Sequence, residues 1–165
     1  MKIRPLTPDD LPALRQFWLE RWGDEFVVAH GVVYRPEGLE GFVALEAEEW
    51  IGAITLAFLD GECEIVSIDS LREAKGVGTA LIGKAIEAAG AKGCRRIFLI
   101  TTNDNLNALG FYQKRGFELA ALHRGAVNES RKLKPGIPLI GANGIPLRGE
   151  LELEMSLVSG STDGV

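Results

Sequence analysis

The chain has 165 residues, which suits one domain of ordinary size and is short for two. With 46% apolar and 25% charged residues, it has the composition of a globular protein and not of a disordered or collagenous chain. Its net charge of −5 argues against nucleic-acid binding and mildly favours cationic ligands. No apolar run reaches the roughly 18 residues that a membrane span needs, and the first residues lack the apolar stretch of a signal peptide. We therefore expect a cytoplasmic protein that binds no membrane.

The residue types that bind metals are few and scattered. Cys63 and Cys94 belong to no C-x-x-C pair, and the histidines of the sequence are His30 and His123. A structural zinc site needs a close cluster of such ligands. The sequence therefore predicts no metal site and two buried free thiols.

The N-terminal part begins with a strand over residues 1–6 and continues with a helix. Thr7 suits the N-cap position and Pro8 the first helical position, and two aspartates follow in the first turn, where carboxylates are favoured by the helix dipole. Apolar side chains then recur at helical spacing as far as Trp22. The stretch between Trp22 and Pro36 shows no clear period, and we expect a loop with some helix there.

The middle of the chain predicts an antiparallel meander and then a crossover. Strands are expected at residues 42–45, 50–59 and 62–70. Asp60-Gly61 between the last two is typical of a two-residue hairpin turn. A helix with a broad apolar face is expected from Gly76 to Ala91, and residues 97–100 are an apolar run typical of a strand covered on both faces. Strand, helix and strand in this order predict one parallel pair with a right-handed connection.

The last third of the chain adds a helix, a long connection and a strand. The helix is expected from Asn105 to Lys114, with a strand after it. Residues 124–149 are rich in proline and glycine, and a connection of this length is either functional or has structure of its own; a repeated Ile-Pro-Leu predicts a hairpin-like excursion. Apolar and polar residues alternate over 151–157 as the final strand. We expect one domain over residues 1–158 and a disordered tail at 159–165.

The segment Lys75-Gly76-Val77-Gly78-Thr79 lies between a predicted strand and a predicted helix. Glycines let the backbone approach a ligand closely, and the first amides of the helix point at it with the positive end of the dipole. This arrangement favours a pyrophosphate. Leu81 stands where a dinucleotide fingerprint needs a third small residue, and the sequence contains no G-x-x-x-x-G-K-[ST] phosphate loop.

A second segment identifies the type of nucleotide. The residues Asn105-Leu106-Asn107-Ala108-Leu109-Gly110-Phe111-Tyr112, with Gly116-Phe117 after them, resemble the N-x-x-A-x-x-x-Y then G-F segment of the Gcn5-related N-acetyltransferase (GNAT) superfamily. The glycine segment resembles the family's [Q/R]-x-x-G-x-[G/A], and the element order resembles the family over residues 1–158. The resemblance implies an α/β (α+β mixed) fold with helices on both faces of a mostly antiparallel sheet, whose one parallel strand pair is splayed for acetyl-CoA.

The resemblance also implies a cofactor site. Pantetheine would pair with the free edge of the strand at 62–70, since an exposed edge has unused donors and acceptors. The cofactor-binding residues expected are Ile68, Asp69, Ser70, Ala74, Lys75, Gly76, Val77, Gly78, Thr79, Asn105, Asn107, Ala108 and Tyr112. One position departs from the family, because Glu73 stands where Gln or Arg is usual. We expect Glu73 to turn outward and Arg72 or Lys75 to supply the positive charge.

Acetyl transfer to an amine poses two proton problems. An alkylamine is almost wholly protonated at neutral pH, so a base has to remove a proton before nitrogen attacks the thioester, and the departing thiolate needs an acid. The resemblance suggests Tyr112 as the acid. The resemblance also favours Glu64 as the base, since family members often carry a glutamate on the strand before the glycine segment, and Asp69, His123 or water are the alternatives.

The sequence therefore predicts an acetyl-CoA-dependent N-acetyltransferase that acts on a primary amine of a small molecule or amino acid in a ternary complex. The alternatives are a protein N-terminal or lysine acetyltransferase, and a non-catalytic acyl-CoA-binding regulatory module. Loops usually carry specificity, which leaves the acceptor to residues 22–36 and 124–149. A small-molecule amine is the expected partner of a monomer or homodimer.

Overall fold

The structure, a computed structural model, describes residues 1–71 and 76–158. Within these residues one mixed sheet has the strand order β1-β4-β5-β6-β7-β9-β8. In that order its strands are β1 (Lys2–Pro5), β4 (Glu40–Glu46), β5 (Glu49–Leu59), β6 (Glu62–Ser70), β7 (Arg96–Thr102), β9 (Glu150–Ser156) and β8 (Glu118–His123). Neighbouring strands are antiparallel except β6 and β7, which are parallel. The predicted fold class is confirmed.

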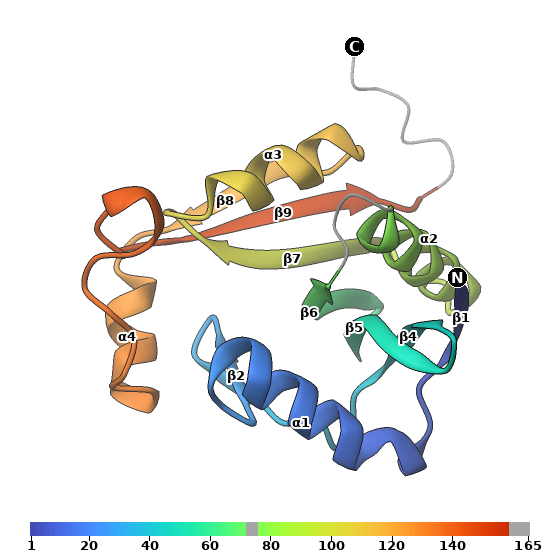
Figure 1. Ribbon diagram of the computed structural model, residues 1–165. Coiled ribbons are helices and arrows are strands. Elements are labelled where there is room, and N and C mark those ends of the chain that lie inside the picture. Colours follow the sequence, from blue (N-terminus) through green and yellow to red (C-terminus); the bar gives the residue numbers. More distant parts are fainter. Residues whose placement is uncertain (72–75, 159–165) are drawn as a thin grey trace.

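Helices cover both faces of this sheet (Figure 1). They are α1 (Leu11–Trp22), α2 (Val77–Ala91), α3 (Leu106–Lys114) and α4 (Ala126–Leu133), with short 3-10 turns at Pro8–Asp10 and Ala142–Gly144. One face packs on α1 through Leu14, Phe17 and Trp18, and the other packs on α2 and α3. None of the described helices combines the length and the apolar composition that a membrane crossing requires.

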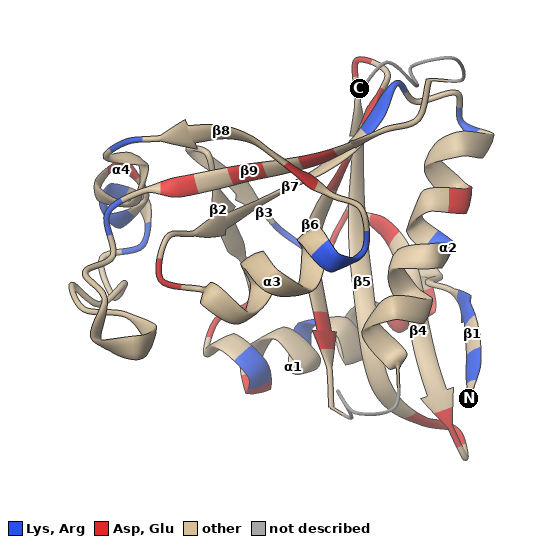
Figure 2. Cartoon of the chain, turned by 90° about the horizontal axis from the view of Figure 1, so that it is seen from above, with Lys and Arg blue, Asp and Glu red and all other residues tan. Residues whose placement is uncertain are grey.

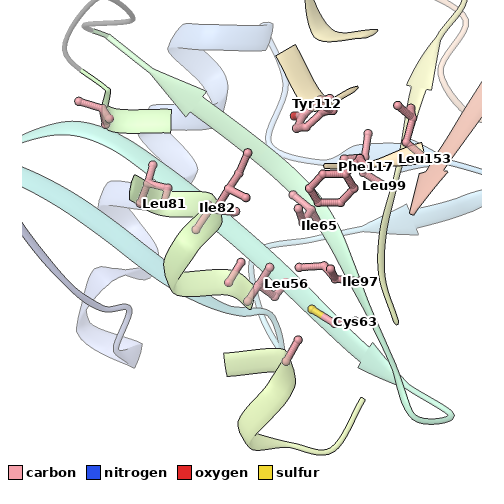
Figure 3. Close-up of a cluster of buried hydrophobic side chains, with 14 of the residues drawn as sticks. Leu56, Cys63, Ile65, Leu81, Ile82, Ile97, Leu99, Tyr112, Phe117 and Leu153 are labelled. Atoms are coloured by element: carbon pink, nitrogen blue, oxygen red, sulfur yellow. The ribbon is translucent and has the colours of Figure 1, made fainter. Parts of the chain in front are cut away.

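The larger core lies between the sheet and helices α2 and α3. Ile65, Leu99 and Leu153 come from three adjacent strands and meet Tyr112 and Phe117 (Figure 3). All five side chains are buried, and burial of large apolar groups is the main favourable term in folding. This core fixes α3 over the place where β6 and β7 separate.

The parallel pair is formed over only part of its length. Register partners run from Glu62 with Arg96 to Ile65 with Leu99, and none follows. At that point β6 carries a bulge, because Val66 is an extra residue between the partners of Thr55 and Leu56 on β5. A bulge bends a strand and increases its twist. Beyond Val66, β6 stays paired with β5 while the end of β7 stays paired with β9, so two strand edges separate.

The expectation of a loop with some helix between Trp22 and Pro36 is wrong. These residues form the hairpin β2 (Val27–Ala29) and β3 (Val32–Tyr34). Its turn residues His30 and Gly31 both have positive φ, 41° and 78°, as a two-residue turn of type I′ requires. The turn escaped prediction because histidine stands where asparagine or aspartate is usual.

The connection 124–149 has structure of its own. It begins with α4, which the sequence did not predict, and it then forms the expected hairpin-like excursion, with a bridge between Ile140 and Pro146. Asn103 and Asp104 hold this excursion. The Asn103 side chain accepts the amide protons of Arg148 and Gly149, and Asp104 accepts that of Ala142. The N-cap of α3 is the next residue, Asn105.

Candidate active site

The separating edges of β6 and β7 enclose a cavity of about 200 Å³, named here the gap cavity. Ser67 and Ile68 line it from β6, Ile100 and Thr101 from β7, and Tyr112 from α3. Neither edge has a register partner across the gap. Free strand edges present unused amides and carbonyls, which an extended amide-bearing chain can satisfy.

A second cavity, of about 400 Å³, lies beside the start of α2 and is named here the α2 cavity. Gly76 is the N-cap of α2 with a φ of 73°, a conformation that glycine adopts without strain. A Cβ atom at Gly78 would lie 3.1 Å from the Phe111 ring, so glycine keeps this approach open. The helix therefore presents its first amides to the cavity with no side-chain cap.

Most residues expected at the cofactor line this α2 cavity. They are Ile68, Asp69, Ser70, Gly76, Gly78, Thr79, Asn105, Asn107, Ala108 and Tyr112. Val77 does not line it, because its side chain is fully buried in the core beneath α2. Ala74 and Lys75, with Arg72 and Glu73, lie outside the described residues.

Arg115 is a lining residue of the α2 cavity that sequence analysis missed. Its guanidinium lies 3.5 Å from the centre of the Phe111 ring, donates to Thr79 Oγ1 at 2.8 Å and donates to the carbonyl of Phe111 at 2.8 Å. Stacking on an aromatic ring holds an arginine in place. The signal was present, since an arginine lies between Tyr112 and Gly116 in the segment that carries the family resemblance.

Two side chains join the α2 cavity to the gap cavity. Asn105 accepts the amide proton of Ala108 at 3.2 Å and donates to Thr101 Oγ1 at 3.2 Å, so one amide caps α3 and braces the end of β7. Tyr112 packs edge-on against Phe111 and Phe117. Its hydroxyl has no hydrogen-bond partner in the part of the chain that the structure describes. Burial, with a smaller effect of the nearby Asp69 charge, raises the pKa of Tyr112.

Glu64 lies on the face of β6 that points away from the core beneath α2 and α3 and toward the β2–β3 hairpin. Its buried carboxylate accepts the Tyr34 hydroxyl proton at 2.5 Å and lies 3.0 Å from Nε2 of His30. The His30 amide donates to Glu150 on β9 at 3.0 Å. The hydrogen bond to Glu64 is the main effect that raises the pKa of His30, against burial, which lowers it. Sequence analysis missed the roles of His30 and Tyr34 because it did not predict the hairpin.

The other candidate bases have close partners. Asp69 receives two hydrogen bonds from Arg21 of α1, at 2.7 and 3.0 Å. His123 lies 3.0 Å from Glu152 and lines none of the cavities described in this section. Figure 2 shows that acidic residues recur along β9, where Glu150 and Glu152 lie.

A third cavity, of about 450 Å³, lies beside α4 and is named here the α4 cavity. It has mainly apolar walls, including Phe26 of the segment before β2 and Val127 of α4. Its polar lining includes Glu150, Ser130 and Lys134. The gap cavity shares Trp22, Val66, Ile100 and Thr101 with the α4 cavity, and it shares Ile68, Asn105, Ala108 and Tyr112 with the α2 cavity. The strand gap thus connects the two sides of the sheet.

Comparison with known proteins identifies this arrangement. The family model described as Acetyltransferase (GNAT) family matches residues 5–117. The chain belongs to this family. It is 45% identical over 139 residues to the uncharacterized protein YdhI of Bacillus subtilis, covering 84% of this chain and 87% of that one. It is also 45% identical over 152 residues to the uncharacterized protein YxbD of the same organism, covering 92% and 94%.

Solved GNAT structures have the same fold. An acetyltransferase from Bacillus subtilis in complex with CoA has a TM-score of 0.68 at 25% identity. The match covers 95% of this chain and 100% of that one. A GNAT family acetyltransferase from Elizabethkingia anophelis with acetyl-CoA bound has a TM-score of 0.68 at 23% identity, over 94% and 97%. The predicted family and the predicted acetyl-CoA dependence are confirmed.

The residues of this GNAT chain fit acetyl-CoA. The α2 cavity has uncapped helix amides and the Arg115 guanidinium for a pyrophosphate. The gap cavity that continues from it has a free strand edge for an amide-bearing arm. In acetyl-CoA the pyrophosphate is joined to this arm, and the two cavities adjoin in the matching order.

Proposed function

We propose that the chain moves the acetyl group of acetyl-CoA to the primary amine of a small molecule or amino acid by direct attack in a ternary complex. The observation that supports this most is the gap cavity, which shares lining residues with the α2 cavity on one side and the α4 cavity on the other. A thioester that enters from one side and an amine that enters from the other therefore meet at the strand gap. Holding two reactants in contact is itself a large part of catalysis.

The first task of the site is to hold the cofactor. The amides of Gly78 and Thr79 and the guanidinium of Arg115 bind the pyrophosphate. The edge of β6 near Ile68 pairs with the amide-bearing arm, and Asn105 lies beside it. When bound, acetyl-CoA supplies an acetyl group activated as a thioester.

The second task is proton transfer. Glu64 takes one proton from the ammonium form of the acceptor, and the neutral nitrogen then bonds to the acetyl carbon. The second proton that this nitrogen loses replaces the one that Tyr112 gives to the sulfur. Since Glu64 lines none of the three cavities, the first proton passes through a water molecule. His30 and Tyr34 hold the carboxylate in position. Asp69 is less suited, because Arg21 already holds both of its oxygens.

Tyr112 gives its proton to the sulfur as the carbon–sulfur bond breaks. The ring lines both the α2 and the gap cavities, and its neighbours Phe111 and Phe117 fix its orientation. A pKa raised by burial keeps the phenol protonated at neutral pH, which a general acid requires.

The proposal is tested by measuring release of the CoA thiol from acetyl-CoA with a panel of primary amines, amino acids and peptides with free N-termini, and by weighing the products. Small amines should give turnover and a product heavier by one acetyl group. Saturable binding of acetyl-CoA without turnover on any acceptor would instead indicate a regulatory module. Turnover confined to the peptides would indicate a protein acetyltransferase and overturn the choice of acceptor.

A further inference from the structure

We propose that the α4 cavity binds the acceptor, and that it selects a primary amine with an apolar body and no carboxylate, held by Glu150 and Ser130. This inference rests on the proposed function, whose acceptor class it narrows. It depends on an unpartnered buried hydroxyl, a buried carboxylate with an unused oxygen, and the composition of the cavity wall.

Ser130 lines the α4 cavity from α4 and is 3% exposed. Its Oγ atom has no hydrogen-bond partner among the described residues. Buried hydroxyls are normally satisfied, because leaving a hydrogen bond unmade in the interior is costly. A serine in a helix usually avoids this cost by bonding a carbonyl of the preceding turn. Ser130 lines the α4 cavity, so its unpartnered hydroxyl is available for a hydrogen bond to a ligand there.

Glu150 begins β9 and is also 3% exposed. Its Oε1 accepts the His30 amide proton at 3.0 Å, and its other oxygen has no hydrogen-bond partner in the described parts of the chain. Removing a carboxylate from water is costly unless a cation or several donors compensate it. An ammonium group is a cation with three N–H donors, so the carboxylate and the Ser130 hydroxyl suit it as acceptors.

The side chains that line the α4 cavity indicate which kind of organic group carries the ammonium. Trp22, Phe26, Val127, Ile137 and Leu147 are among its apolar lining residues. A volume of about 450 Å³ lies within the range of small-molecule sites, which combine apolar walls with a few polar groups. This composition favours an aromatic or branched aliphatic body over a hydrophilic one.

The charges around the cavity argue against a carboxylate on the acceptor. Lys134 is the single lysine or arginine among the lining residues that the structure describes. It lies 3.5 Å from Asp24 and donates to the Phe26 carbonyl at 3.5 Å, so its charge already has a partner. A carboxylate in this cavity would find no free cation among the described lining residues, and Glu150 and Asp104 would repel it.

The test uses three amines that differ by one feature each. Against 2-phenylethylamine, L-phenylalanine adds a carboxylate and methylamine lacks the apolar body. Each is titrated calorimetrically into the full chain in the presence of CoA, which allows binding without transfer, and each is then assayed with acetyl-CoA. We expect 2-phenylethylamine to bind at least about tenfold more tightly than either of the others.

Two variants address the residues. Glu150→Gln keeps an oxygen for the His30 amide and removes the charge, and it should weaken 2-phenylethylamine binding about tenfold or more. Ser130→Ala should weaken it about three- to tenfold without lowering the melting temperature, because no protein hydrogen bond is lost. Glu154→Gln is the matched control, since Glu154 lies on the same strand but does not line the cavity, and it should leave the affinity unchanged.

The outcomes separate this inference from the proposed function. Binding with the expected order, without release of CoA thiol, would support the acceptor site and overturn the enzyme. Turnover whose KM for the amine is the same in the Glu150→Gln, Ser130→Ala and unchanged chains would support the enzyme and overturn this site. Equal or tighter binding of L-phenylalanine would overturn the selection against a carboxylate.

Discussion

Nε2 of His30 lies 3.0 Å from the Glu64 carboxylate, although 34 residues separate them in the chain. The contact depends on the hairpin turn, in which His30 has a φ of 41°. A non-glycine residue in this region is uncommon and carries some strain. The turn brings the imidazole over β6 and the amide of the same residue to Glu150, so His30 joins a carboxylate of the proposed proton path to one of the proposed acceptor site.

This contact predicts a stability that depends on pH. The folded pKa of His30 is raised above its ordinary value of 6.5, chiefly by Glu64, and Glu150 and Glu152 add to the effect. A raised pKa means that the contribution is complete below about pH 6.5 and is lost as the pH rises through the folded pKa. His30→Asn, which tolerates the turn conformation, should therefore lower the free energy of unfolding more at pH 5.5 than at pH 9.

The measurement is urea unfolding of the two proteins at both pH values. Tyr34→Phe serves as the control, since it removes another hydrogen bond of Glu64 through a group whose pKa is raised and which stays neutral over this range. Its cost in stability should vary little with pH. An equal difference between His30→Asn and the parent at both pH values would argue against the charged pair.

Glu64→Gln is predicted to lower kcat by about two orders of magnitude or more, since general-base catalysis commonly contributes that much. The substitution keeps an acceptor for the Tyr34 hydroxyl, so the hairpin should stay in place. The readout is the pH–rate profile with a saturating amine, in which the fall in rate at acid pH should weaken or disappear. A profile that matches the parent in shape and height would remove Glu64 from the mechanism.

Tyr112→Phe is predicted to lower kcat by about 10²-fold or more and to leave the KM for acetyl-CoA nearly unchanged. The phenylalanine ring keeps the contacts with Phe111 and Phe117 and loses only the proton donor. Burial raises the pKa of Tyr112 above the ordinary tyrosine pKa of 10.0. The parent should therefore show no loss of rate from ionisation of Tyr112 between pH 7 and pH 10.0. A large rise in KM at constant kcat would assign the hydroxyl to binding.

Most residues that the sequence predicted at the cofactor line the α2 cavity, because the glycine segment and the Asn105–Tyr112 segment act through backbone amides and local helix geometry that a short sequence fixes. For the acceptor, the sequence indicated residues 22–36 and 124–149 but no individual side chain, for the opposite reason. His30, Ser130 and Glu150 are far apart in the chain, and only the β2–β3 hairpin and α4 bring them together. The hairpin was not predicted because a histidine occupies its turn. The helix α4 was not predicted because the prolines that follow it favour a loop over residues 124–149.

Arg115→Ala is predicted to raise the KM for acetyl-CoA and to make that KM less dependent on salt. The guanidinium lines the α2 cavity, and salt screens its attraction for a phosphate. The loss should be about tenfold, the size expected for one charge-assisted contact. Lys114→Ala removes an adjacent charge that does not line the cavity and is the matched control. If both variants raised KM equally, net charge rather than the position of Arg115 would be responsible.

Gly141→Ala is predicted to lower the free energy of unfolding by about 1–3 kcal/mol, the usual cost of overpacking. A Cβ at this position would collide with the Asp104 carboxylate and would lie 2.8 Å from Cγ of Leu147. Asp104 has little freedom to retreat, because it accepts the Ala142 amide proton at 2.8 Å and the Thr102 hydroxyl proton at 2.5 Å.

The matched control for this variant is Gly136→Ala, at a glycine with open space around it and no positive φ. That change should be neutral or slightly stabilising, since alanine restricts the unfolded chain. Denaturant midpoints of both variants give the comparison. Leu147 and Asp104 also line the α4 cavity, so Gly141→Ala should raise the KM for the amine more than that for acetyl-CoA. Equal midpoints for the two variants would show that the hairpin-like excursion around Gly141 shifts to accommodate the added Cβ and that Asp104 does not hold it in place.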